Sequence, residues 1–249
     1  MNYLSRSKRK LRAPKSPKLD ETRRLKREKA LRQLLTSEIQ DNVILGIGSG
    51  STMALFVELL AYEIRRGTVQ NIVAVPTSYQ IKLLLSKHGI PYRDPWQVDA
   101  VDIAIDGADQ VNLHLQAIKG GGAALLMEKI VDSMSNKTIF VVEEEKLTDI
   151  LNKPVPLEVL PSAISFVMRK VRELGGRPTL RIAPAGKVGP VVTDSGNVII
   201  DVDFGDIRDP ESLETKLLQI PGVLECGLFC NIAHSLYVGT LDGVRVYHR

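Results

Sequence analysis

The feature that most constrains the fold is the alternation of short apolar runs with helical segments between residues 43 and 143. Four apolar runs lie at 43–48, 71–76, 101–106 and 138–143. The segments between the runs have apolar residues at helical spacing. Strands joined by crossover helices pair in parallel, and a parallel sheet is covered on both faces. The pattern therefore predicts an α/β fold with a Rossmann-like parallel sheet.

The order of elements changes after Lys153. Between residues 154 and 233 the pattern is β-α-β-β-α-β, the split βαβ arrangement of ferredoxin-like domains. Asp209 is placed to cap the second helix of this part, and Pro210 suits its first turn. The segment 235–247 is a further strand or hairpin that returns to the first sheet. We expect a basic disordered tail at 1–18, a Rossmann-like catalytic domain formed by 19–153 and 234–249, and a smaller ferredoxin-like α+β domain at 154–233.

The net charge of +4 comes from the N-terminal tail. Residues 1–18 hold seven Lys or Arg and no acid, which leaves 26 basic against 29 acidic residues in the rest of the chain. This balance argues against a nucleic-acid partner, except through weak contacts of the tail. The tail also has the composition of a mitochondrial presequence, and this alternative stays open beside a cytoplasmic location.

Cysteines and histidines show no metal-binding spacing. Cys226 and Cys230 form a C-x3-C pair that fits neither a zinc knuckle nor a thioredoxin motif, and we expect two small residues on one face of a strand. The four histidines are scattered. No disulfide framework is implied, which favours the reducing cytoplasm. The longest uncharged stretch, 43–57, is too short and too polar to span a bilayer, so we expect no membrane partner.

Three of the predicted parallel strands end in polar loops, GIGSGST at 46–52, PTSYQ at 76–80 and DGADQVN at 106–112. Ligands of open parallel sheets bind beyond the carboxyl ends of the strands. We therefore expect these three loops to form one site.

The first loop has the features of a phosphate cradle. Gly48 and Gly50 allow close approach of the backbone to an anion, and the next helix directs its free N–H groups there. Ser51 or Thr52 is placed to cap that helix. The loop lacks the third Gly and the later acid of a dinucleotide fingerprint, so a monophosphate fits better. A tight turn without a ligand is the alternative.

The third loop has a D-x-x-D spacing that either Mg²⁺ or a turn could use. Its acids are Asp106 and Asp109. Lys119 follows, just before three glycines, and a cation there would neutralise the acids as well as a metal would.

Glu128 lies on the helix after the three glycines. It is about 120° from an apolar stripe that we place through Ala123, Met127, Ile130 and Met134. This flank position lets Glu128 either lean into a cleft or face water.

Taken in order, these motifs resemble ribose-5-phosphate isomerase of the A type, from about residue 25 to the end. GIGSGST is similar to that family's G-x-G-T-G-S-T, DGADQVN to D-G-A-D-E-[VI]-[DN], and KGGGAALLMEKIV to K-G-G-G-x-A-L-x-R-E-K-I-[VI]. PTSYQ, VVEEEKL, PVPLEVLP, TDSGNVIIDVDF and IPGVLECGLF match further segments. The departures Gln110, Met127 and Glu145 neighbour the functional positions and bear on substrate affinity more than on chemistry.

The resemblance implies interconversion of D-ribose 5-phosphate and D-ribulose 5-phosphate, a step of the non-oxidative pentose phosphate pathway. It implies no cofactor, no metal, and a homodimer or homotetramer. Glu128 would be the proton-abstracting base, Lys119 would lie by the carbonyl end, and Lys146 would hold phosphate together with a lysine of the first helix, Lys26 or Lys29. The implied substrate-binding residues are Ser49, Gly50, Ser51, Thr52, Asp106, Gly107, Ala108, Asp109, Lys119, Gly120, Gly121, Gly122 and Lys146.

The chemistry of this reaction explains the cluster of charged residues. Moving a carbonyl between C1 and C2 through an enediolate needs one carboxylate to shuttle the proton, which fits Glu128. A fixed cation near the oxygen stabilises the developing anion, which fits Lys119. The furanose ring must first open, and Asp106 is the candidate acid–base group for that step.

Two other classes of function remain as alternatives. A sugar-phosphate-binding regulatory module has a related fold but needs neither Glu128 nor Lys119. A related sugar-phosphate enzyme, such as an amino-sugar-phosphate deaminase, or a CoA transferase is disfavoured by the ordered set of motifs.

Overall fold

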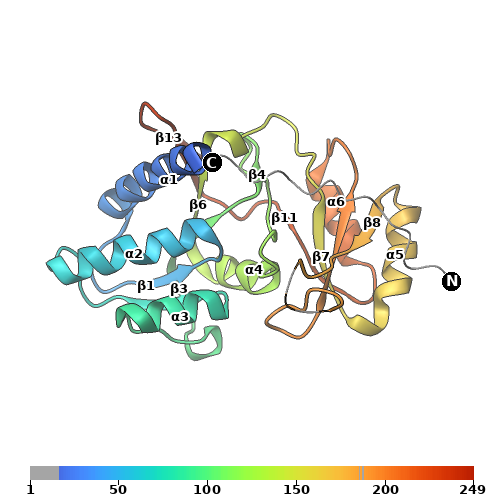
Figure 1. The fold of residues 1–249 in the computed structure, drawn as a ribbon, viewed down its shortest axis with the longest axis horizontal. Coiled ribbons are helices and arrows are strands. Elements are labelled where there is room, and N and C mark those ends of the chain that lie inside the picture. The colour runs from blue at the N-terminus through green and yellow to red at the C-terminus, as the bar shows by residue number, and fades with distance from the viewer. Residues whose placement is uncertain (1–16, 185, 187) are drawn as a thin grey trace.

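The computed structural model describes residues 17–184, 186 and 188–249 (Figure 1). Its α-helices are α1 (Pro17–Glu38), α2 (Ser51–Arg66), α3 (Tyr79–His88), α4 (Leu125–Ser133), α5 (Ile164–Glu173) and α6 (Pro210–Leu218). Its strands are β1 (Ile44–Ile47), β2 (Val73–Pro76), β3 (Val101–Gly107), β4 (Gln110–Val111), β5 (Ala117–Ile118), β6 (Ser135–Glu143), β7 (Val155–Val159), β8 (Arg177–Leu180), β9 (Val198–Asp203), β10 (Val223–Cys226), β11 (Leu228–Phe229), β12 (Ser235–Gly239) and β13 (Val244–His248).

The main sheet has six strands in the order β13-β12-β6-β3-β1-β2. All neighbours are parallel except β12 and β13, which form an antiparallel hairpin. The α/β fold predicted from the alternating pattern is thus confirmed, and the segment after residue 234 does return to the first sheet. The strand order reverses between β1 and β3, which is the switch point where open parallel sheets bind ligands.

Helices cover both faces of this sheet, as Figure 1 shows. On one face, α1, α2 and α3 bury a large apolar core against the central strands. On the other face, α4 packs on β3, β6 and β1. A small group of apolar side chains fills this second contact, among them Ala104 of β3 and Val131 of α4. The close approach of α4 requires glycine at position 46, because a Cβ there would lie 2.7 Å from Val131 Cγ1.

Residues 154–233 form an antiparallel sheet with strand order β10-β7-β9-β8. With α5 and α6 this is the predicted β-α-β-β-α-β arrangement. Asp209 caps α6 by accepting a hydrogen bond from Ser212 N at 3.1 Å, and Pro210 is the first helical residue. This part has its own apolar core. We therefore propose two lobes, a large lobe of 19–153 and 234–249 and a small lobe of 154–233.

A third sheet, β11-β5-β4, joins the two lobes. The segment 223–230, which the pattern predicts as one strand, is two strands that part at Gly227, so that prediction is wrong in detail. A Cβ at Gly227 would lie 2.4 Å from Lys119 O, so β11 turns away to pair with β5 where the backbones meet. Cys226 and Cys230 accordingly do not share a strand, and both are free and buried.

Helix α1 begins at Pro17, so the last two positions of the predicted tail, 17 and 18, belong to the helix and that boundary is wrong. The rest of the expected tail lies outside the described residues. Within the described part of the chain, no helix is long and apolar enough to cross a membrane.

Candidate active site

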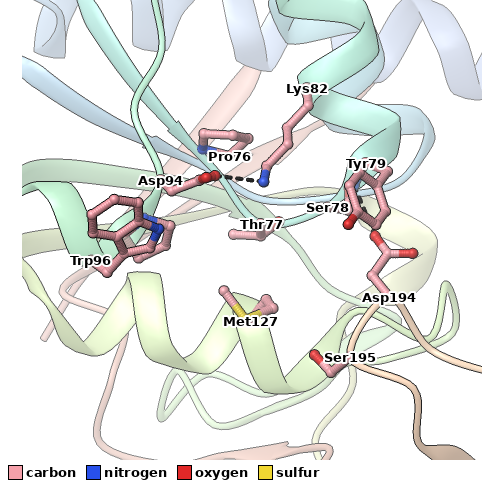
Figure 2. A pocket seen from close by; sticks show the side chains of 11 residues that line it. Pro76, Thr77, Ser78, Tyr79, Lys82, Asp94, Trp96, Met127, Asp194 and Ser195 are labelled. Atoms are coloured by element: carbon pink, nitrogen blue, oxygen red, sulfur yellow. Dashed lines mark hydrogen bonds and ion pairs between the residues drawn. The ribbon is translucent and has the colours of Figure 1, made fainter.

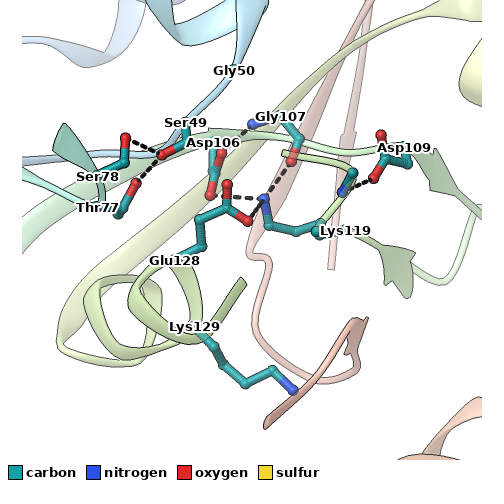
Figure 3. Close-up of polar contacts among 12 residues, drawn as sticks. Ser49, Gly50, Thr77, Ser78, Asp106, Gly107, Asp109, Lys119, Glu128 and Lys129 are labelled. Carbon is teal, nitrogen blue, oxygen red and sulfur yellow. Dashed lines mark hydrogen bonds and ion pairs between the residues drawn. The ribbon is translucent and has the colours of Figure 1, made fainter. Parts of the chain in front are cut away.

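The loops after β1, β2 and β3 gather at one edge of the main sheet, as predicted (Figure 3). Gly48 N donates to Ile105 O at 2.9 Å, which joins the first loop to β3 directly before the third loop. Ser49 Oγ lies 2.7 Å from both Thr77 Oγ1 and Ser78 Oγ, which joins the first loop to the second. A backbone hydrogen bond and a group of three hydroxyls thus hold the three loops together.

Gly48 has no room for a side chain. A Cβ at this position would lie 1.8 Å from Asp106 Oδ1. The first loop therefore closes over the carboxylate of the third loop, and only glycine permits this contact.

The first loop leads into α2, with Gly50 at the helix N-cap. Gly50 has φ +91°, a conformation that favours glycine. No side chain caps the helix, so the expected cap by Ser51 or Thr52 is wrong: both are helical residues. Their hydroxyls and the first N–H groups of the helix remain the candidate anion cradle.

Two cations lie at this cradle. Arg27 of α1 donates from Nη1 to Ser51 Oγ at 2.6 Å. Lys146 lines the same cleft as Ser51 and Thr52, and burial lowers the pKa of its ammonium, although Glu143 opposes the shift. Glu143 Oε2 lies 3.5 Å from Lys146 Nζ.

Lys119 is the centre of the buried part of the site (Figure 3). Its Nζ forms ion pairs with Asp106 Oδ2 at 2.7 Å and Glu128 Oε2 at 3.2 Å, and it donates a hydrogen bond to Gly107 O at 2.7 Å. The side chain is only 2% exposed. The ammonium also lies over the rings of Phe140 and Phe229, at 5.7 and 5.1 Å from their centroids. These contacts hold the ammonium in one place.

Burial and charge change the acid strengths in this cluster. Burial, and then the charge of Glu128, raise the pKa of Asp106 well above its usual range, although Lys119 opposes the shift. The charges of Asp106 and Glu128 raise the pKa of Lys119 above its ordinary value against the opposing effect of burial, the largest single influence. The site thus pairs a permanently charged ammonium with a carboxyl group that tends to hold a proton.

Glu128 faces this cluster from the first turn of α4 and is 5% exposed. A solvated helix acid is therefore excluded. The predicted apolar stripe of this helix is wrong, since Ile130 is 39% exposed and the buried face carries Glu128, Lys129 and Asp132 beside Leu125 and Val131. Helical spacing alone cannot reveal this, because the buried face mixes charged and apolar residues.

Lys129, next to Glu128, anchors α4 to the small lobe. Its Nζ donates to Glu214 and Glu225 at 2.7 Å each and to the carbonyl oxygens of Cys226 and Leu228. The position of Glu128 is thus tied to both lobes.

The glycine segment 120–122 forms the wall of the cleft opposite α2. Gly121 N donates to Asp109 Oδ2 at 2.8 Å, and a Cβ on Gly121 would lie 2.8 Å from Asp109 Oδ1. Arg181 of the small lobe donates to the carbonyl oxygens of Gly120 and Gly121. Both lobes therefore shape this wall.

The cleft between these walls has a volume of about 450 Å³, its open mouth included. It collects twelve of the thirteen residues predicted to bind substrate, together with Glu128. Those residues are Ser49, Gly50, Ser51, Thr52, Gly107, Ala108, Asp109, Lys119, Gly120, Gly121, Gly122 and Lys146. The remaining one, Asp106, lies directly behind the wall, in contact with Lys119.

The three departures from the family motifs have separate environments. Glu145 pairs with Lys26 at 2.7 Å, so its charge is compensated away from Lys146. Gln110 accepts from the backbone N–H groups of Asn152 and Lys153 and holds that loop in place.

Met127, the third departure, lies outside the cleft. It lines a neighbouring pocket beyond Thr77 and Ser78, opposite the exposed ring of Trp96 (Figure 2).

Arg27 is the binding candidate that sequence reasoning missed. Lys26 Nζ pairs with Glu144 and Glu145, and Lys29 donates to Leu241 O. Arg27, between these two lysines on α1, donates to Ser51 Oγ instead. The sequence shows several cations on this helix. It does not show which of them faces the first loop, because that depends on how α1 packs on the sheet.

Within the described part of the chain, one group of side chains has the spacing of a metal site, Glu214, Glu225 and Cys226. The ammonium of Lys129 already lies 2.7 Å from both carboxylates. Asp106 and Asp109, the pair considered for Mg²⁺, are engaged by Lys119 and Gly121 N respectively. The acids of the cleft thus have protein cations and donors as partners.

The sequence matches the family model of ribose 5-phosphate isomerase A (phosphoriboisomerase A) over residues 73–243. Ribose-5-phosphate isomerase A of Pyrococcus horikoshii is 46% identical over 213 residues, covering 85% of this chain and 93% of that protein. The same enzyme of Thermosynechococcus vestitus is 48% identical over 208 residues, covering 82% of this chain and 88% of that protein.

Solved structures give the same relationship. A D-ribose-5-phosphate isomerase in complex with phospho-erythronic acid is similar with a TM-score of 0.88 and 44% identity, covering 91% of this chain and 99% of that chain. Ribose 5-phosphate isomerase A from Methanocaldococcus jannaschii has a TM-score of 0.85 and 38% identity, covering 90% and 98%.

Proposed function

Because this chain belongs to the ribose 5-phosphate isomerase A family, the aldose–ketose isomerases that interconvert D-ribose 5-phosphate and D-ribulose 5-phosphate, we propose that Glu128 is its catalytic base. The observation that carries this proposal is the buried Lys119 ammonium, which lies 3.2 Å from the Glu128 carboxylate at the wall of the cleft. A base and a fixed cation side by side suit a reaction that moves a proton while negative charge develops on an oxygen.

The reaction begins with the furanose form of the sugar, whose ring must open. Asp106 tends to hold a proton because it is buried beside Glu128, but its carboxyl lies behind the cleft wall. Its proton would pass to the ring oxygen through the ammonium of Lys119, which contacts Asp106 and lines the cleft, while a base removes the proton of the C1 hydroxyl. Asp109, held by Gly121 N, is placed to orient the sugar hydroxyls.

In the open-chain aldehyde, Glu128 removes the C2 proton. The electron pair of the broken C2–H bond forms the C1–C2 double bond, and the carbonyl pair moves to the oxygen at C1. Lys119 stabilises that oxygen as the enediolate forms. The proton of the C2 hydroxyl moves to the C1 oxygen, the carbonyl forms at C2, and return of the proton from Glu128 to C1 then gives the ketose.

The phosphate binds at the N-terminal end of α2. Ser51 and Thr52 supply hydroxyl donors, and Arg27 and Lys146 supply charge. The free N–H groups and the dipole of the helix favour an anion at this end. Binding energy at this remote group aligns C1 and C2 with Glu128.

The test is the formation of ketose from ribose 5-phosphate by the purified protein in the presence of EDTA. We expect full activity, because Lys119 and hydrogen-bond donors supply the positive charge that the reaction needs. Activity that disappears in chelator and returns with Mg²⁺ would contradict the cofactor-free mechanism.

We further propose that the protein lies in the cytoplasm and forms a homo-oligomer. The free buried cysteines support a reducing compartment such as the cytoplasm. Large apolar side chains of and beside α3 are exposed, such as Leu83 at 71% and Trp96 at 81%, and a second copy of the chain would cover such a surface. Light scattering that gives the mass of a single chain would exclude the oligomer.

A further inference from the structure

Asp132 is a buried carboxylate that the proposed mechanism does not use. It is 2% exposed and lies on α4, four residues after Glu128. Its backbone oxygen accepts from the hydroxyls of Ser135 and Thr138, which fixes the end of the helix. Its Oδ2 has no hydrogen-bond partner among the described residues. Buried polar atoms are normally paired, so this atom calls for an explanation.

The charges around Asp132 belong to the catalytic cluster. Residues four apart on a helix share a face, with about 5–6 Å between their Cβ atoms. Lys119 attracts the Asp132 charge, Glu128 repels it and Lys129 attracts it. The charge of Asp132 also raises the pKa of Asp106 on β3, as a smaller contribution than burial and Glu128.

The other titratable groups on the strands packed against α4 are engaged elsewhere. Asp102 accepts from Ile44 N, Lys137 pairs with Glu38, Glu143 lies beside Lys146, and Glu225 and Cys226 face Lys129. Asp132 therefore interacts mainly with Lys119, Glu128 and Lys129.

The cluster holds more acid than base. Asp106 and Glu128 lie 2.7 and 3.2 Å from the buried ammonium of Lys119, and Asp132 adds a third buried carboxyl on the helix that carries Glu128. Ionising all three carboxyls would leave excess negative charge away from water, which is unfavourable. Burial, with a smaller contribution from Glu128, raises the pKa of Asp132 to about 7 against the opposing charges of Lys119 and Lys129. Its charge therefore changes near neutral pH.

We propose that Asp132 is a positioning residue that acts through Glu128, because its negative charge one helical turn away favours the step in which Glu128 takes up the C2 proton. The Glu128 carboxylate becomes neutral in that step, so its repulsion from Asp132 is relieved. The negative charge moves to the substrate oxygen, where Lys119 compensates it. This inference rests on the role proposed for Glu128.

The experiment is the pH profile of kcat, at saturating ribose 5-phosphate, for the wild type and Asp132→Asn. Asparagine keeps the shape of the neutral acid but never ionises. We expect the two profiles to coincide near pH 6. Through about pH 7 the wild type should rise and the variant should not, which leaves the variant about three- to tenfold slower at pH 8.5. Asp99→Asn, an exposed site with the same change of charge, is the matched control and should follow the wild type.

Two results would overturn the inference. One is a pair of profiles with the same shape, whether superimposed or uniformly lowered, because a merely structural role would give that result. The other is a variant faster than the wild type at pH 8.5. Asp132→Leu also removes the charge and carries the same expectation if the Asn variant does not fold.

Stability gives a second readout on the folded variant. A buried carboxyl with a raised pKa costs stability as pH rises from its unfolded value to its folded value. The thermal midpoint of Asp132→Asn should therefore gain on the wild type between pH 4 and 7, and a constant difference would contradict the inference. Failure here is distinct from failure of the proposed function, which would show as turnover in Glu128→Gln.

Discussion

Replacing Lys119 by Met should destabilise the protein and slow the reaction, and the two losses should have different pH dependence. The structure gives the size of the first loss. The ammonium contacts two buried carboxylates, at 2.7 and 3.2 Å, and a carbonyl oxygen at 2.7 Å. Removing one partner of such a buried pair costs about 3–5 kcal/mol, because the other charge stays behind. For a chain of this length that corresponds to a fall in Tm on the order of 10 °C.

The sign of the pH dependence follows from Asp106. Its folded pKa is already raised, and removal of Lys119 raises it further, since Lys119 opposes the shift. A carboxyl with a raised folded pKa loses stability as pH rises above its unfolded value of about 4. The wild type shares this loss up to its own folded pKa of Asp106, so the added destabilisation of Lys119→Met develops above that pKa and should be smaller at pH 5 than at pH 8.

Thermal denaturation at pH 5 and pH 8 measures this effect. The double variant Lys119→Met with Asp106→Asn should recover part of the stability at pH 8, because the carboxyl left unpaired is gone, but none of the activity. In steady-state kinetics Lys119→Met should lose about 10²–10³-fold in kcat and bind enediolate-like inhibitors more weakly. A Tm within about 2 °C of the wild type at pH 8, or an equal loss at both pH values, would refute the reasoning.

Two further outcomes concern the first loop. Gly48→Ala should abolish turnover and lower Tm, because its Cβ would lie 1.8 Å from Asp106 Oδ1. Gly243→Ala is the control and should change little, because the space around Gly243 is open. An active Gly48→Ala protein would contradict the prediction and show that Asp106 can move. Lys146→Met should raise KM strongly for ribose 5-phosphate and leave the poor turnover of unphosphorylated ribose unchanged. Initial rates on both sugars measure this. Equal effects on the two sugars would exclude a contact between Lys146 and the phosphate.

The layers of the fold followed from sequence, because period and strand length differ between a buried parallel sheet and an amphipathic helix. The split of 223–230 into two strands did not, since Gly227 is required by a contact with Lys119 O from a distant segment. The N-cap of α2 was also wrong, because Gly50 takes the cap position with a positive φ and leaves Ser51 inside the helix.

The polar cluster of the site was predicted as a set of residues but not as a geometry. Motif order brought Asp106, Lys119 and Glu128 together. The burial of Asp132 and the approach of Arg27 to Ser51 depend on how helices pack on the sheet, which spacing along the chain does not contain. The buried face of α4 carries charged residues, so the positions of its apolar residues alone did not identify that face.

Glu128→Gln is the decisive variant for the role of Glu128 as the carrier of the C2 proton. Glutamine keeps the shape and hydrogen-bonding capacity of the side chain but is no base. We expect a fall in kcat of about 10²–10⁴-fold with KM within a fewfold of the wild type, and loss of exchange of the C2 hydrogen with solvent. A Glu128→Gln protein that turns over within about threefold of the wild type, or still exchanges that hydrogen, would contradict it.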